Sequence, residues 1–208
     1  MTHELMQIQP VTLQGHFIRL EPLSQVHHAD LCEAGDDPEI WRWNPRPILT
    51  AEEMRVYIAT AKAGQAAGTM LPFATIERLS GRAIGSTRFA EIDRPHRHLE
   101  IGYTWIKPRW QRTPVNTEAK YLMLRHAFEE LGCIRVELKT DALNQRSRNA
   151  ILRIGAQQEG IFRKHMVTDS GRIRHSVYFS LIDSEWPVVK ARLEEKLARP
   201  FERPPERR

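Results

Sequence analysis

The chain has 208 residues, of which 41% are hydrophobic and 27% are charged, and its formal net charge is +5 at pH 7. These values are those of an ordinary soluble protein with one large core, and no apolar run approaches the roughly 18 residues of a membrane span. The start of the chain lacks the basic and then apolar pattern of a signal peptide, and its two cysteines, Cys32 and Cys133, spell out no disulfide framework. We therefore expect a cytoplasmic protein without a membrane partner.

The first half of the chain predicts a strand, two helices and then three strands. Ser24 can cap the first helix, and Thr50 with Glu53 three positions later forms a capping box for the second. A proline-rich loop between the two helices carries Trp41 and Trp43. These elements are expected over residues 11–20 (strand), 24–34 (helix), 36–47 (loop), 50–64 (helix), and 72–79, 83–92 and 98–106 (strands).

The third strand of this block alternates in polarity along its length. One predicted face carries Leu99, Ile101, Tyr103 and Trp105, and the other carries Glu100, Gly102 and Thr104. Such alternation is typical of a half-buried strand, and three strands joined by short turns predict an antiparallel meander.

The second half of the chain alternates between helices and strands. The elements are expected as a helix starting near residue 114, a strand over residues 134–140, a helix over 144–154, strands over 158–166 and 173–182, and a last helix after residue 183. A mixed α+β fold on one central sheet is the simplest architecture for this order. We expect a single domain over residues 1–198 and a disordered, basic, proline-rich tail over residues 199–208.

The stretch WQRTPVNTEA predicts a helix start that can hold an anion. Thr113 can act as the N-cap, and Pro114 suits the first helical position because its missing N–H would be unpaired there. The free amides of Val115 and Asn116, together with the helix dipole, then form a site for negative charge. Taken alone, this signal is weak, because most helix N-termini bind only water.

Positive charge is concentrated in the segment that starts at this motif. Between Arg109 and His175 the chain has 13 Lys or Arg against 7 Asp or Glu. A solvated basic face, a phosphate-bearing ligand and a nucleic acid each account for this excess of positive charge.

A further motif, in DALNQRSRNAILRIGA, places Asn144 and Ser147 on one side of a first helical turn. The alternative for Asn144 is simple helix capping.

Four stretches resemble the GNAT superfamily of acyl-CoA-dependent N-acetyltransferases, in its RimJ/RimL-like branch. They are LEIGYTWIKPRWQ, VNTEAKYLMLRHAFEELG, RVELKTDALNQRSRNAILRIGA and DSEWPVVKARL. The resemblance covers residues 12–197. It implies a mostly antiparallel, twisted sheet of about seven strands that is flanked by helices and splayed between its fourth and fifth strands.

The resemblance also implies which residues bind acetyl-CoA. In the family, the end of the fourth strand pairs with the pantetheine arm, and amides of the following loop wrap the pyrophosphate. The residues so implied are Trp105, Ile106, Lys107, Gln111, Arg112, Thr113, Val115, Asn116, Thr117, Asn144 and Ser147. Two features depart from the family pattern. Pro114 and Asn116 replace the glycines of the loop, and Ile151 replaces a tyrosine that many members use as a general acid.

By the same resemblance, Glu100 is the candidate general base, since similar enzymes place a base on this strand. Glu137 is the reserve candidate, and an ion pair with a neighbouring strand is the structural alternative for Glu100. Because the tyrosine is missing, Ser147 or a water would protonate the leaving thiolate. A backbone amide at the splay, that of Ile106, is a candidate to meet the oxyanion.

Two other pairs of residues, one of tryptophans and one of histidines, can each be interpreted either structurally or functionally. Trp41 and Trp43 either form a wall of the acceptor site or pin their loop to the core. His96 and His98 alternate at a strand start and could share a metal, but the sequence suggests no third ligand near them. We therefore interpret them as surface histidines and expect no metal.

The leading hypothesis is an enzyme that transfers an acetyl group from acetyl-CoA to a primary amine by direct attack in a ternary complex. The acceptor amine would belong to a protein N-terminus, a peptide or a small molecule. The alternative is a non-catalytic, regulatory module that binds acyl-CoA. A nucleic-acid binder ranks last, because the basic segment has no recognition helix and CoA phosphates explain its charge as well. Similar proteins often pair through a sheet edge or the C-terminal helix, so a homodimer is also an option.

Overall fold

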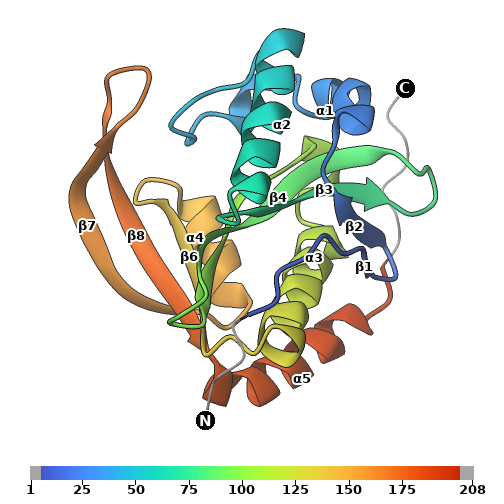
Figure 1. Cartoon of the computed structure of the whole chain (residues 1–208), viewed down its shortest axis with the longest axis vertical. Helices are drawn as coiled ribbons and strands as arrows, with labels where there is room; N and C mark the ends of the chain where they lie inside the picture. Colours follow the sequence, from blue (N-terminus) through green and yellow to red (C-terminus); the bar gives the residue numbers. More distant parts are fainter. Residues whose placement is uncertain (1–5, 202–208) are drawn as a thin grey trace.

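A computed structural model describes residues 6–201 of the chain. Its centre is an eight-stranded sheet with the order β1-β2-β3-β4-β5-β6-β8-β7 (Figure 1). The strands are β1 (Leu13–Gln14), β2 (Ile18–Pro22), β3 (Leu71–Glu77), β4 (Ala83–Asp93), β5 (His98–Ile106), β6 (Arg135–Asp141), β7 (Gln157–Val167) and β8 (Ile173–Ile182). Every neighbouring pair is antiparallel except β5 and β6, which are parallel.

Within residues 6–201, five α-helices pack around this sheet, and short 3₁₀ or π-helical turns connect several elements. The helices are α1 (His28–Ala34), α2 (Ala51–Ala66), α3 (Pro114–Arg125), α4 (Gln145–Arg153) and α5 (Trp186–Leu197). The short turns are η1 (Gln25–His27), η2 (Pro38–Ile40), η3 (Pro108–Trp110), η4 (His126–Glu130) and η5 (Asp183–Glu185). None of the helices within residues 6–201 combines the length and apolarity needed to cross a membrane.

The predicted α+β fold and mostly antiparallel sheet are confirmed, with one more strand than the predicted seven. The extra strand arises because the predicted first strand divides into β1 and β2. The backbone N–H of Gly15 donates to the carbonyl of Ile18 at 2.9 Å, which closes a tight turn between β1 and β2.

Most of the tail predicted over residues 199–208 lies outside the described residues. Of the part that is described, Arg199 pairs with Glu195 at 2.9 Å.

Two apolar clusters occupy opposite faces of the sheet. One cluster contains Leu99, Ile101 and the buried side chains of α3 and α5. The other contains Trp41, Trp105 and the buried side chains of α1 and α2. Because each helix pair covers one face, apolar residues line both sides of the central strands, as in other sheets buried between helices.

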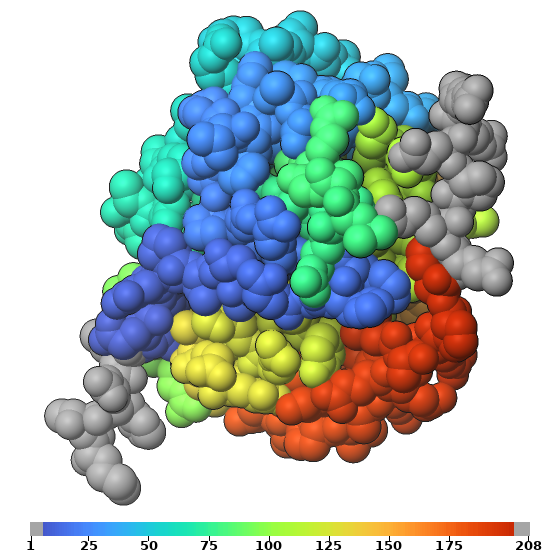
Figure 2. Space-filling view, turned by 90° about the vertical axis from the view of Figure 1, so that its right-hand side faces the viewer, coloured from blue at the N-terminus to red at the C-terminus, as the bar shows by residue number. Residues whose placement is uncertain are grey.

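A single carboxylate joins the N-terminal strands to α3. Glu118, which is 4% exposed, accepts hydrogen bonds from the backbone N–H groups of His16, Phe17 and Ile18 at 2.6 to 2.8 Å. Figure 2 shows the N-terminal segment, in dark blue, lying directly against the yellow region that follows α3. Without this carboxylate, the three amides would have to find other partners at the edge of the core.

The strands β5 and β6 separate soon after they meet. Their parallel pairing covers three positions, from His98 opposite Arg135 to Glu100 opposite Glu137. Beyond Glu100 the two strands diverge, so the sheet opens toward the end of β5. This is the splay between the fourth and fifth predicted strands, and it lies immediately before the loop that leads into α3.

Candidate active site

The loop between β5 and α3 forms the predicted helix start. Thr113 is the N-cap, and its hydroxyl oxygen accepts from the N–H of Val115 at 3.3 Å while the hydroxyl donates to the carbonyl of Trp110 at 2.7 Å. Arg112 has a φ of +62°, the left-handed conformation that glycine usually supplies. The chain therefore turns into α3 with Arg112 in a position where many loops need a glycine. Its side chain is exposed beside the positive end of the helix dipole.

Side-chain hydrogen bonds tie this loop and α3 to α4 at two points. Gln111 donates to the carbonyl of Ile106 at 3.2 Å, and its side-chain oxygen accepts from Arg146 on α4 at 2.5 Å. One turn into α3, the hydroxyl of Thr117 accepts from Arg153 at 3.3 Å. The loop, the end of β5 and the helix that carries Ser147 are thereby held together around the splay.

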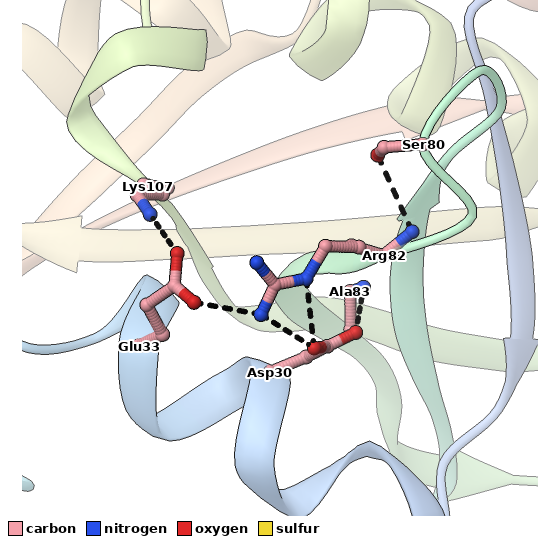
Figure 3. Close-up of polar contacts among 6 residues, drawn as sticks. All are labelled: Asp30, Glu33, Ser80, Arg82, Ala83 and Lys107. Atoms are coloured by element: carbon pink, nitrogen blue, oxygen red, sulfur yellow. Dashed lines mark hydrogen bonds and ion pairs between the residues drawn. The ribbon is translucent and has the colours of Figure 1, made fainter. Parts of the chain in front are cut away.

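The side chain of Lys107 is directed away from this loop. Its ammonium group donates to Glu33 of α1 at 2.8 Å, and Glu33 also accepts from Arg82 at 2.6 Å. Figure 3 shows Lys107 and Arg82 meeting at the carboxylate of Glu33, and Arg82 also contacting Asp30. Its backbone N–H donates to the carbonyl of Ile84 at 2.8 Å, and its carbonyl accepts from the N–H of Trp110 at 2.9 Å, so a ligand could reach Lys107 only through a second bond to that carbonyl.

The first turn of α4 places Asn144 and Ser147 together. Asn144 is the N-cap of α4, and its side-chain oxygen accepts from the backbone N–H of Ser147 at 3.0 Å. Both residues are partly exposed. Farther along the helix, Ile151 is 7% exposed and belongs to the core, so it presents no polar group to the site.

Glu100 is buried at the last pairing position before the splay. Its side chain faces away from Leu99 and Ile101 and forms an ion pair with Lys139 of β6, at 2.7 Å between Nζ and Oε2. Burial raises the pKa of Glu100 above its ordinary value, and the charge of Lys139 opposes this shift. A Cβ at residue 102 would lie 2.3 Å from Oε1 of this carboxylate, so the absence of a side chain at Gly102 lets the Glu100 side chain lie where it does.

The alternation predicted for β5 is wrong beyond Gly102. Ser86 pairs with Trp105 and Arg88 pairs with Gly102, so Tyr103 and Thr104 together lie opposite a single residue, Thr87. This bulge reverses the faces of the following residues. Tyr103, with a φ of +52°, is 49% exposed, while Trp105 joins the α1–α2 cluster and not the cluster of Leu99 and Ile101.

The bulge turns Thr104 toward Lys120 of α3. The ammonium of Lys120 donates to the Thr104 hydroxyl oxygen at 2.6 Å, and this hydroxyl also lies 2.7 Å from the hydroxyl of Thr87. Lys120 is 5% exposed, and burial lowers its pKa to about 7, although the charge of Glu100 acts in the opposite direction. The sequence contained a signal for this group, because Lys120 interrupts the apolar side of a helix.

A second buried cation lies on the other face of the bulge. The guanidinium of Arg88, which is 2% exposed, lies between the rings of Tyr57 and Tyr103, at 4.2 and 4.5 Å from their centroids. Such contacts stabilise a cation that is removed from water. Neither Arg88 nor Tyr57 was a candidate from the sequence, because their proximity depends on how α2 packs on the sheet.

The two predicted substrate tryptophans have different surroundings. Trp41 is 3% exposed, donates its indole N–H to the carbonyl of Gly35 at 2.9 Å, and packs on Trp105 with 5.0 Å between ring centroids. Trp41 thus holds its loop to the core. Trp43 is partly exposed and contacts Arg172 of the β7–β8 hairpin, 5.6 Å from the ring centroid.

Comparison with known proteins agrees with this geometry. Residues 18–157 match the family model described as the acetyltransferase (GNAT) domain. The chain is 26% identical over 157 residues to the uncharacterized N-acetyltransferase p20 of Bacillus licheniformis, across 75% of this chain and 87% of that protein. It is 33% identical over 110 residues to YdaF of Bacillus subtilis, named as a candidate ribosomal N-acetyltransferase, across 53% of this chain and 59% of YdaF.

Solved structures share the whole fold. A GCN5-related N-acetyltransferase from Brucella melitensis superposes with a TM-score of 0.86 at 34% identity, over 92% of this chain and 87% of that chain. RimJ of Mycobacterium smegmatis, solved in complex with CoA-disulfide, superposes with a TM-score of 0.79 at 20% identity, over 90% of this chain and 95% of that chain.

Proposed function

Because this chain belongs to the GNAT acetyltransferase family, we propose that it is a RimJ/RimL-like member that transfers an acetyl group from acetyl-CoA to a primary amine. The attack is direct, within a ternary complex of enzyme, acetyl-CoA and amine. The acceptor amine belongs to a protein N-terminus, a peptide or a small molecule. The observation that carries the proposal is a buried carboxylate, Glu100, at the point where β5 and β6 diverge beside the α3 loop.

The residues around the loop suit an anionic, elongated cosubstrate. The N-terminus of α3 offers backbone amides and a positive dipole end for a pyrophosphate, and Arg112 adds an exposed charge next to it. The strand β5 leaves its β6-facing edge unpaired with β6 after Glu100, where a pantetheine arm can lie along Trp105 to Lys107 and pair with the backbone of Ile106, since Lys107 N–H is already bonded to Ile84 of β4. We assign the remaining contacts to Gln111, Thr113, Val115, Asn116, Thr117, Asn144 and Ser147.

The chemistry requires one proton acceptor and one proton donor. As the amine nitrogen bonds to the acetyl carbon, it loses a proton, which we assign to the Glu100 carboxylate, directly or through a water. The carbon–sulfur bond then breaks, and the thiolate takes a proton from Ser147 or from a water beside it. Acetyl-CoA supplies an activated acetyl group, so the protein needs to orient the two substrates and move these protons.

Titration calorimetry followed by an acceptor screen tests the proposal. Acetyl-CoA and CoA should bind with micromolar affinity that weakens as salt increases, because phosphate contacts are screened. With an accepted amine, Glu100→Gln should lower kcat by at least about 100-fold while acetyl-CoA affinity is kept.

The matched comparison is Glu137→Gln, which changes the reserve candidate on the neighbouring strand, at the pairing position opposite Glu100; it should leave kcat close to wild type if Glu100 is the base, and a loss of kcat in this variant alone would assign the base to Glu137. Wild-type turnover by Glu100→Gln would remove Glu100 as the base. Tight binding of acetyl-CoA without turnover of any amine would favour the non-catalytic module, and no binding would contradict the assignment of the loop.

A further inference from the structure

A group of metal-ligating side chains lies at the end of the sheet away from the α3 loop. Asp93 is the last residue of β4, His98 is the first of β5, and His96 lies in the turn between them. The group is therefore separated from Gln111 by the whole length of β5. It has no part in the proposed acetyl transfer, and it can be tested independently of that proposal.

The three side chains already converge on one point. His96 Nδ1 lies 2.9 Å from Asp93 Oδ1 and 3.0 Å from Oδ2, and His98 Nε2 lies 3.5 Å from Asp93 Oδ2. One ligand atom from each residue falls within 4.8 Å of the other two. In a tetrahedral zinc site with bonds of about 2.0 to 2.1 Å, ligand atoms are separated by about 3.3 Å. Small rotamer adjustments would thus bring all three atoms onto a common ion.

The backbone of the hairpin holds these residues in place. The N–H of His96 donates to Asp93 Oδ1 at 3.0 Å, and Arg97 donates from Nε to the carbonyl of Gly132 at 2.9 Å. The carbonyl of Arg97 also accepts from the N–H of Ile134 at 2.9 Å, which joins the turn to the chain leading into β6. Because the turn is anchored on both sides, little ordering would be needed when an ion binds.

Two residues next to the group have a left-handed backbone. Glu91 has a φ of +47° and Arg97 a φ of +54°, although neither is a glycine. Such conformations cost free energy and persist where the surrounding structure requires them. Here they accompany the pairing irregularity between Ala90 and Asp93, which shapes the end of β4.

Two of the three residues, Asp93 and His98, line a shallow surface hollow of about 590 Å³, while His96 lies outside it. Asp93, His98, Glu91 and Arg94 are among the residues that line this hollow. His98 is 31% exposed at its side chain and His96 is 76% exposed, so an ion and its waters can reach the nitrogen atoms.

We propose that Asp93, His96 and His98 form a binding site for one divalent transition-metal ion of the zinc type. Two imidazole nitrogens and one carboxylate oxygen bind the ion, and water fills its remaining positions on the side of the hollow. This ligand set favours ions such as zinc over magnesium, which prefers an all-oxygen octahedral shell. The sequence interpretation missed this site because Asp93, three residues before His96, was not considered as the third ligand.

Calorimetric titration of zinc chloride into untagged, chelator-treated protein tests the site directly. The wild-type chain should bind one zinc ion with micromolar affinity, and magnesium chloride at the same concentration should give no comparable heat. Asp93→Asn, His96→Ala and His98→Ala should each weaken zinc binding by at least about tenfold, because each removes one of three protein ligands.

A matched control concerns another pair of residues of the zinc-ligand type, Cys32 and His28. Cys32 Sγ lies 3.5 Å from His28 Nε2, so Cys32→Ser and His28→Ala should leave zinc affinity unchanged if the hairpin is the site. Zinc should also raise the Tm of the wild type, and of Cys32→Ser, but not that of His96→Ala. The proposal is overturned if the wild type shows no binding tighter than millimolar, if the three hairpin variants bind as tightly as the wild type, or if Cys32→Ser loses the site.

Discussion

Lys120 should make the stability of this protein depend on pH in a way that one substitution removes. Its ammonium is buried in α3 against the Thr104 hydroxyl, and its pKa is lowered to about 7 by that burial. In the unfolded chain, a lysine keeps its proton up to a pKa of about 10.4. Between these two values the unfolded chain binds the proton and the native protein does not.

The difference of about 3.5 pKa units corresponds to roughly 4 to 5 kcal/mol in the free energy of unfolding. Because the unfolded state binds more protons, stability rises with pH through this window, by up to about 1.4 kcal/mol per pH unit. Below pH 7 the native Lys120 is charged as well, so the whole cost of burying the ammonium is present there.

Lys120→Met removes this titration and keeps the volume of the side chain. We expect the variant to gain several kcal/mol over the wild type at pH 6 and to lose most of the rise in stability between pH 7 and pH 9. Urea unfolding of both proteins at pH 6, 7, 8 and 9 measures this, with Lys62→Met, at an exposed position of α2, as the control. The same slope in Lys120→Met and in the wild type would refute the reasoning.

Two further predictions concern buried groups outside the splay. Glu118→Gln should lower the free energy of unfolding by about 2 kcal/mol, because an amide cannot accept from all three N-terminal N–H groups. The control Glu130→Gln, at an exposed position, should change the free energy of unfolding by less than about 0.5 kcal/mol. If urea unfolding shows the same loss for both variants, the hydrogen bonds of Glu118 do not stabilise the N-terminal strands as argued. Burial raises the pKa of Cys133 to about 12, and Cys32 is the more exposed of the two cysteines. At pH 8 a thiol reagent should therefore label Cys32 before Cys133. Rapid labelling of Cys133 in the folded Cys32→Ser variant would contradict this prediction.

Much of the local structure follows from the sequence because its causes are local. The cap at Thr113 needs only a short polar side chain and the amides that follow it, and the same holds for Thr50 with Glu53. The side of β5 that carries Glu100 was predicted correctly from the alternation around Leu99 and Ile101. The order of helices and strands, and with it the α+β class, was predicted in the same way.

The contacts between neighbouring strands, and between the sheet and its helices, could not be predicted from local sequence patterns. The alternation in β5 gives no sign of the bulge at Tyr103, because the bulge depends on the register with β4. That bulge turns Thr104 toward Lys120 and sends Trp105 to the α1–α2 face.

The sequence by itself therefore determined the elements, their order and their caps, since these depend on side chains within a few positions of one another. Only the tertiary structure decided that Glu100 is buried where β5 and β6 part, and that the register of β4 with β5 sets Asp93 opposite His98. The physical reason is that strand register and helix docking are set by the packing of whole faces against each other. Groups that are far apart in sequence, or separated by a turn, acquire their partners, burial and charge only through that packing.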